Sequence, residues 1–166
     1  MPNTRHGVTS VSQQVEEDLD PGGSIEGHPS GTVLIVDDNA VVRHSLGYRL
    51  GLSGYQIQLA AGVNDAFALL GQASRFSALI VDVFLTDGSG ADIVRRWREQ
   101  YPHSPVIIMS GFSGIEDSLR ELLNERTRFM QKPLQPHHLL QQLNQMRDDF
   151  ESALAGRASG GTNPSQ

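Results

Sequence analysis

The sequence predicts a doubly wound α/β domain with a five-stranded parallel sheet, and two observations support this fold class. Four short, mostly apolar runs alternate with stretches of helical periodicity, a pattern typical of strands that helices bury on both faces. Each run ends in a polar or charged residue. In such sheets the ligand crevice lies outside the carboxyl ends of the strands. The sequence therefore predicts both the architecture and the sheet edge that carries a functional site.

The first strand and helix follow from an aliphatic run and the helical spacing after it. Thr32–Val36 is the run, and Val41–Leu52 carries apolar side chains at helical intervals. Ser53 and Gly54 then end the helix. The next strand, Tyr55–Ala60, alternates apolar residues with glutamines, which predicts an edge strand half open to water.

The remaining elements repeat the alternation of strand and helix. Pro133 ends the last strand, because proline has no N–H for a sheet and keeps the preceding residue extended. Right-handed crossovers between parallel strands then make a doubly wound sheet. In chain order these elements are a helix over Asn64–Leu70, a strand ending at Asp82, a helix over Ala91–Tyr101, a strand ending at Ser110, a helix over Glu116–Arg126, a strand ending before Lys132, and a helix from Pro136 to about Ala155.

Length and composition predict one domain with terminal extensions. The chain has 166 residues, of which 38% are hydrophobic, enough for a single core. Residues 1–30 are rich in Gly, Ser, Pro and acids with few large apolar side chains, so we expect a flexible arm there. We expect the domain over residues 31–151, and a helix end with a flexible tail over residues 152–166.

Charge and residue types exclude several classes of function. The net charge of −6 argues against general affinity for nucleic acid or an acidic membrane surface. The chain has no cysteine, which excludes disulfides and thiolate ligands. No stretch approaches the roughly 18 apolar residues of a spanning helix, and no secretory signal pattern opens the chain. We therefore expect a cytoplasmic protein that binds neither nucleic acid nor membrane.

Five polar side chains are expected to converge at the carboxyl edge of the sheet. Asp37, Asp38, Asp82, Ser110 and Lys132, the only lysine, each follow or end a predicted strand. Like charges so close require a cation, and an all-oxygen set favours Mg²⁺. A metal, an ammonium and a hydroxyl around one carboxylate suit a phosphoryl group. Asp82 is the expected nucleophile, since it ends the central strand before a glycine-rich loop.

These motifs, in this order, resemble the response regulator receiver domain of two-component signalling, a CheY-like, flavodoxin-like (βα)5 fold with strand order 2-1-3-4-5. Ser110 lies 28 residues after Asp82, and Lys132 lies 22 residues after Ser110, which matches the family. The resemblance covers roughly residues 31–151. It rests on the acidic pair Asp37-Asp38, the acceptor segment Asp82–Gly90, Ser110-Gly111 and Lys132-Pro133.

The resemblance implies a role for each of these residues. The family places Mg²⁺ on Asp38, Asp82 and the backbone carbonyl of Phe84, with Asp37 acting directly or through water. Ser110 and Lys132 then meet the phosphoryl oxygens. In addition, Ser110 and Phe129 form the switch, in which the aromatic ring turns inward on activation.

The function implied is transfer of a phosphoryl group to Asp82, followed by hydrolysis of the acyl phosphate. The donor is the phosphohistidine of a sensor histidine kinase or a histidine phosphotransfer protein, and the output is carried by protein contacts. Such a chain phosphorylates and dephosphorylates itself and is not a dedicated enzyme. Two alternatives are a phosphate shuttle in a phosphorelay and a Mg²⁺-dependent aspartyl phosphatase, although the latter requires a second acid where this chain has Phe84.

Two positions depart from common patterns of the family, and two others border the path of the attacking water. The switch aromatic is Phe129 and not tyrosine. Thr86 stands where many receivers have proline, and we expect it to leave its loop freer. Phe84 and Phe112 stand two residues after the acceptor and two after the hydroxyl residue. Neither ring can orient water through a strong hydrogen bond, which predicts slow hydrolysis of the acyl phosphate.

The last helix suggests a self-association surface. Its apolar stripe continues through Phe150 and Leu154, past the expected edge of the domain, where little remains to be covered. Exposed apolar strips commonly mark partner surfaces. We therefore expect a homodimer through the face made by the fourth helix, fifth strand and fifth helix.

Overall fold

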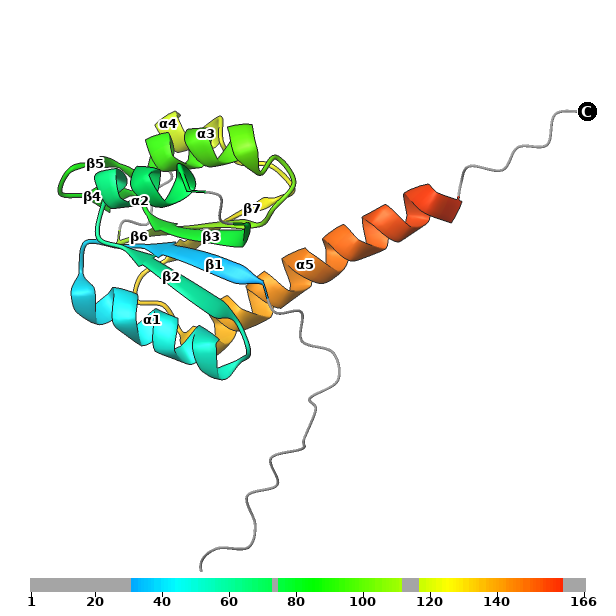
Figure 1. The fold of residues 1–166 in the computed structure, drawn as a ribbon, viewed down its shortest axis with the longest axis horizontal. Coiled ribbons are helices and arrows are strands. Elements are labelled where there is room, and N and C mark those ends of the chain that lie inside the picture. Colours follow the sequence, from blue (N-terminus) through cyan, green and yellow to red (C-terminus); the bar gives the residue numbers. More distant parts are fainter. Residues whose placement is uncertain (1–30, 73–74, 112–116, 160–166) are drawn as a thin grey trace, which may run out of the picture.

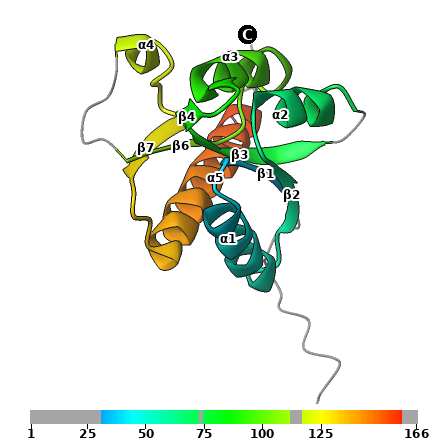
Figure 2. The ribbon, with the colours of Figure 1, turned by 90° about the vertical axis from the view of Figure 1, so that its left-hand side faces the viewer.

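A computed structural model describes residues 31–72, 75–111 and 117–159. A five-stranded parallel sheet lies at its centre, with helices on both faces (Figures 1 and 2). The arm expected over residues 1–30 and the last seven residues, 160–166, lie outside the described residues. The predicted fold class is confirmed.

The main sheet has the order β2-β1-β3-β6-β7. Counting only these five strands along the chain, this is the predicted order 2-1-3-4-5, with the glutamine-containing strand at one edge. A two-stranded antiparallel hairpin, β4-β5, stands apart from the sheet. The strands are β1 Thr32–Val36, β2 Gln56–Ala60, β3 Phe76–Asp82, β4 Phe84–Leu85, β5 Gly88–Ser89, β6 Val106–Ser110 and β7 Thr127–Gln131.

The helices divide the core into two layers. One layer packs α1 and α5 against one face of the sheet through Leu46, Leu50, Leu139, Leu143 and Met146. The other layer packs α2, α3 and α4 against the opposite face, around the fully buried Trp97. The helices are α1 Ala40–Leu52, α2 Val63–Leu70, α3 Gly90–Gln100, α4 Asp117–Arg120 and α5 Pro136–Ser159.

The register of the parallel strands aligns their carboxyl ends. Val36 of β1 pairs with Val81 of β3, so the residues that follow them, Asp37 and Asp82, lie side by side. Asp82 in turn pairs with Met109, the residue before Ser110. The sheet therefore delivers three predicted site residues to one edge.

Helix α4 is shorter than predicted. The sequence pattern indicated a helix over Glu116–Arg126, but the described helix covers Asp117–Arg120, and Glu116 lies outside the described residues. The side chain of Asn124 accepts hydrogen bonds from the Arg126 N–H at 2.8 Å and the Thr127 hydroxyl at 3.1 Å. Asparagine side chains compete with helical hydrogen bonding in this way, and the chain turns into β7.

Two further sequence expectations were wrong. The glycine-rich segment after Asp82 forms the β4-β5 hairpin, in which Phe84 pairs with Ser89. Phe150, expected to have little to cover, stacks on His103 with ring centroids 6.2 Å apart. The Arg126 guanidinium also lies over the Phe150 ring, 4.9 Å from its centroid.

Helix α5 extends beyond the sheet towards the C-terminus (Figure 1). It ends at Ser159, a few residues after the predicted end near Ala155. The side chain of Leu154 lies outside the described part of the chain. Among the described residues, no helix combines the length and apolarity needed to cross a membrane.

Gly90, at the start of α3, couples the fold to the site. A Cβ at Gly90 would lie 2.1 Å from the backbone oxygen of Asp82, so Gly90→Ala must displace the end of β3. We expect a loss of about 1–3 kcal/mol in the free energy of unfolding, measured by urea denaturation.

Gly51 in α1 is the matched control for this prediction. A Cβ there has no neighbour within 4 Å, and alanine is the better helix former by about 0.5–1 kcal/mol. Gly51→Ala should therefore stabilise the domain. Equal effects of the two substitutions would contradict the close approach at Gly90.

Candidate functional site

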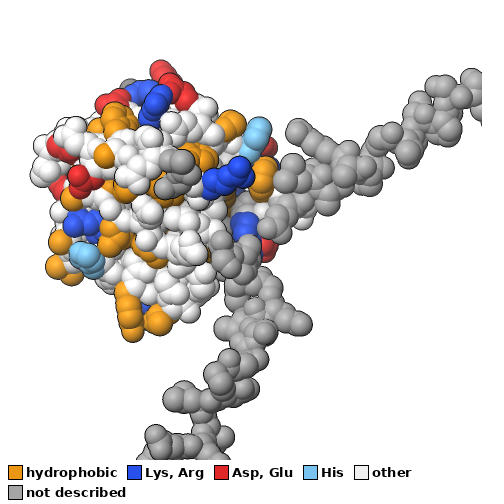
Figure 3. Space-filling view, in the orientation of Figure 1, with side chains coloured by type: hydrophobic (Ala, Val, Ile, Leu, Met, Phe, Trp, Pro, Cys, Tyr) orange, Lys and Arg blue, Asp and Glu red, His pale blue; other side chains and the backbone are white. Residues whose placement is uncertain are grey.

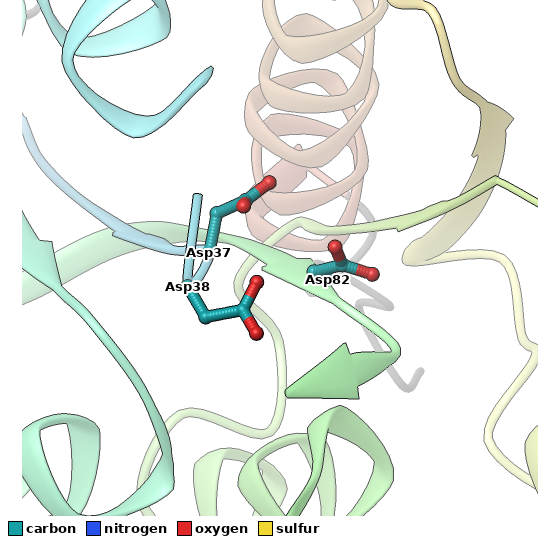
Figure 4. A group of neighbouring side chains, drawn as sticks. All are labelled: Asp37, Asp38 and Asp82. Atoms are coloured by element: carbon teal, nitrogen blue, oxygen red, sulfur yellow. The ribbon is translucent and has the colours of Figure 1, made fainter. Parts of the chain in front are cut away.

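Three carboxylates gather at the carboxyl edge of the sheet (Figure 4). Asp37 and Asp38 follow β1 and Asp82 ends β3, and one oxygen from each lies within 4.8 Å of the others. Asp37 is fully buried, Asp82 is nearly so, and Asp38 is the most exposed of the three. The cluster therefore opens to solvent on the side of Asp38.

Lys132 joins the two buried carboxylates. Its Nζ donates to Asp37 Oδ2 at 2.6 Å and also forms a short contact with Asp82 Oδ2. Burial alone would lower the pKa of Lys132, but the hydrogen bonds and negative charges of Asp37 and Asp82 outweigh burial and raise the pKa above its usual value. Lys132 is therefore an ammonium at neutral pH, and it offsets the repulsion between the two carboxylates.

The charges of the cluster suit a divalent cation. Three carboxylates and one ammonium leave two negative charges uncompensated. All the available side-chain ligand atoms of the acidic group are oxygens, the donors that hard ions such as Mg²⁺ prefer. The residues present therefore fit the metal that the sequence predicted.

Backbone N–H groups orient two of the carboxylates. Asn39 N donates to Asp37 Oδ1 at 2.8 Å, and Phe84 N donates to Asp82 Oδ1 at 3.1 Å. In each case the donor lies two residues after the acid, where the chain turns out of the strand. Arg43 of α1 adds a bond from its Nη1 to the Asp37 carbonyl oxygen at 2.5 Å. Hydrogen bonds therefore hold both the side chain and the backbone carbonyl of Asp37.

Ser110 and Lys132 reach the site from neighbouring strands. Ser110 is buried at the end of β6 and pairs in register with Gln131 of β7. The Lys132 N–H donates to the Ser110 carbonyl oxygen at 2.7 Å, directly before the cis peptide bond to Pro133. The hydroxyl residue and the lysine are therefore held beside each other by the backbone.

The family model for the response regulator receiver domain matches residues 33–144. The chain belongs to this family. Its receiver domain is 34% identical over 101 residues to the virulence transcriptional regulatory protein PhoP of Salmonella typhimurium, a match covering 61% of the chain and 45% of PhoP. It is 29% identical over 102 residues to the probable transcriptional regulatory protein TcrX of Mycobacterium tuberculosis, covering 61% and 43%. The matched region is thus less than half of each relative.

Solved structures share the fold of this receiver. A CheY-like receiver domain protein from Methanospirillum hungatei superposes with a TM-score of 0.68 at 22% identity, covering 75% of this chain and 99% of that one. CheY4 of Vibrio cholerae gives 0.63 at 25% identity, covering 71% and 99%. The expected absence of nucleic-acid binding stays a prediction, because two of the relatives carry names of transcriptional regulators.

The aromatic residues singled out in the sequence lie at different depths. Phe84 is 43% exposed at the rim of the site. Phe129, on β7, is half-buried and packs against the core layer of α2, α3 and α4. Phe112 lies outside the described residues. The roles predicted for these rings in hydrolysis and in the switch stay predictions.

Sequence reasoning missed the role of Asp87 in the receiver. Its carboxylate accepts hydrogen bonds from the backbone N–H of Val63 at 2.8 Å and of Asn64 at 3.0 Å, at the start of α2. The residue before that helix is Gly62, which has no side chain to cap it. A helix start without a local capping side chain was the signal available in the sequence.

Proposed function

We propose that this receiver accepts a phosphoryl group on Asp82 from the phosphohistidine of a partner, in the cytoplasm and with Mg²⁺. The observation that carries the proposal is that Asp82 lies beside the acidic pair and contacts the Lys132 ammonium. A carboxylate oxygen of Asp82 forms the new bond to phosphorus as the bond from phosphorus to the imidazole nitrogen breaks. Water later hydrolyses the acyl phosphate, and protein contacts carry the signal.

Contacts within the cluster favour Asp82 over its two neighbours as the acceptor. Asp37 is fully buried, with Asn39 N on one oxygen and Lys132 on the other. Asp38 accepts the Thr86 N–H on Oδ2. Asp82 is the one whose oxygen touches the ammonium while its side chain keeps some exposure. An ammonium beside the acceptor neutralises charge on the transferred group.

Asp38, Asp82 and the backbone carbonyl of Phe84 would hold Mg²⁺, with Asp37 acting directly or through water. When bound, the ion neutralises phosphoryl oxygens during transfer. The net charge and all-oxygen composition of the cluster support this assignment. Ser110 would donate its hydroxyl to a phosphoryl oxygen.

The switch proposed for this receiver links Ser110 to Phe129. Phe129 pairs with Ile108 on β6, two residues before Ser110, so movement at the end of β6 bears directly on β7. Phe129 has no hydroxyl, and its signal would be a change in burial of the ring as it turns inward.

A sensor histidine kinase or histidine phosphotransfer protein would dock on α1. Val41, Tyr48 and Leu52 are 78%, 68% and 68% exposed on this helix, and Figure 3 shows hydrophobic side chains at the surface on the α1 side. A groove beside α1 is lined by Val42, Leu134 and Lys132 itself. An apolar surface continuous with the acceptor site suits a helical partner that must present its histidine there.

The homodimer through α4, β7 and α5 remains a prediction. Leu139, Leu143 and Met146 are buried against the sheet, and Phe150 is covered by Arg126 and His103. The remaining support is the extension of α5 past the sheet (Figure 1).

Asp82→Asn should abolish acceptance of a phosphoryl group, because an amide oxygen is not the nucleophile that a carboxylate is. Intact-mass measurement after incubation with Mg²⁺ and a small acyl phosphate tests this. Asp149→Asn, which changes an exposed acid on α5, is the control and should gain one phosphoryl group like the wild type. A phosphorylated Asp82→Asn protein would refute the assignment.

Replacing Phe84 with Asn should shorten the lifetime of the acyl phosphate. A polar side chain at this rim can orient the attacking water, and about 1.4 kcal/mol of positioning accelerates hydrolysis roughly tenfold. The decay is followed after the phosphoryl donor is removed, with Phe84→Asn alone and combined with Phe112→Glu. An unchanged rate in the double variant would show that these rings do not control hydrolysis.

Replacing Tyr48 and Leu52 together with alanine should slow phosphoryl transfer from a phosphohistidine protein by roughly tenfold, the effect of about 1.4 kcal/mol of lost binding. Phosphorylation by a small acyl phosphate should be unchanged, since that donor needs no docking surface. Phe67→Ala, which removes an exposed aromatic ring from α2, is the control. Equal slowing with both donors would contradict docking on α1.

A further inference from the structure

The turn of the β4-β5 hairpin contacts the acidic cluster directly. The Thr86 N–H donates to Asp38 Oδ2 at 3.1 Å. Asp38 is the most exposed member of the cluster, so its side chain gains most from an added restraint. Many receivers have proline at this position, and proline has no N–H to donate. The expectation that Thr86 leaves the loop freer stays a prediction, although Thr86 supplies a hydrogen bond that proline cannot make.

The next residue fastens the same turn to α2. Asp87 accepts from Val63 N at 2.8 Å, from Asn64 N at 3.0 Å and from Asn64 Nδ2 at 3.1 Å. A Cβ on Gly62 would lie 2.3 Å from Asp87 Oδ1, so glycine is needed there to admit the carboxylate. These hydrogen bonds lower the pKa of Asp87. The turn is thus held from two sides.

We propose that Thr86 and Asp87 are positioning residues for the Mg²⁺ site. Thr86 orients the Asp38 carboxylate, and Asp87 anchors the turn from which Thr86 donates. The same hairpin carries Phe84, whose carbonyl is a proposed ligand, two residues before Thr86. Fixing the turn therefore fixes two ligands together. The inference rests on the proposed cation site.

Hydrogen bonds to metal-ligating carboxylates commonly contribute 10–100-fold to metal affinity, because the ligand is oriented before the ion arrives. A carboxylate has about four lone-pair sites, so Asp38 can accept the Thr86 N–H and still offer an oxygen to a cation. Loss of the Thr86–Asp38 hydrogen bond, or of the hydrogen bonds from α2 to Asp87, should weaken Mg²⁺ binding without removing any ligand.

Thr86→Pro tests the hydrogen bond from Thr86 to Asp38, with Thr86→Ala as the matched control. Alanine keeps the backbone N–H and proline removes it, while both discard the threonine side chain. Mg²⁺ alone is titrated into the full chain without a phosphoryl donor, and binding is followed by backbone amide NMR shifts at Asp38 and Ser110. We expect the Kd to rise roughly tenfold in Thr86→Pro and to stay within about twofold of wild type in Thr86→Ala.

Asp87→Ala tests the hydrogen bonds between Asp87 and the start of α2, with Asp65→Ala as its control. Asp65 lies in the first turn of α2 itself, and its carboxylate accepts from the Ala61 N–H at 3.1 Å. Neither residue belongs to the hairpin. Both variants remove an acid that accepts a backbone hydrogen bond at the start of α2, so thermal unfolding should shift in both. Only Asp87→Ala should weaken Mg²⁺ binding, and Asp87→Asn, which keeps an oxygen acceptor, should restore part of it.

The outcomes separate this inference from the proposed function. If the wild-type chain fails to bind Mg²⁺, the cation site itself is wrong. If the wild type binds but Thr86→Pro matches Thr86→Ala, or Asp87→Ala matches Asp65→Ala, the positioning role is wrong and the cation site stands.

Discussion

The ammonium of Lys132 between Asp37 and Asp82 is the interaction on which the site depends. Two buried carboxylates so close repel each other, and burying an unpaired charge costs several kcal/mol. Lys132 Nζ contacts both acids, so β1, β3 and β7 can end at one point. The third and most exposed carboxylate, Asp38, then leaves charge for a divalent cation on the solvent side.

The sheet makes this arrangement possible because its register is set by burial on both faces. Helices α1 and α5 cover one face and α2, α3 and α4 the other, so slippage of a strand by one residue would move each aliphatic side chain to the opposite core layer and disrupt its packing. The strand ends are therefore fixed relative to one another, and reactive groups can stand on short turns without losing precision. Gly90 extends this constraint, since its backbone packs directly on the Asp82 carbonyl.

The hairpin after β3 shows how this receiver orders a segment that elsewhere in the family is restricted by proline. Proline restricts the backbone of a chain without reference to its neighbours. Here the restraint comes from contacts instead: the Thr86 N–H binds Asp38, and the Asp87 carboxylate caps α2. The hairpin is thereby joined both to the acidic cluster and to a helix, so its order depends on theirs.

The sequence by itself determined the five strands of the main sheet and the five polar residues at their carboxyl ends, because apolar periodicity and turn residues such as Pro133 act over a few neighbouring positions. The order of the strands followed from the resemblance to receiver domains. Only the tertiary structure decided which separated residues meet. Phe150 is covered by His103, and α2 is capped by Asp87, more than 20 residues later in the chain. These contacts have no local pattern, since they arise where folding brings distant segments together, and the sequence could not place them.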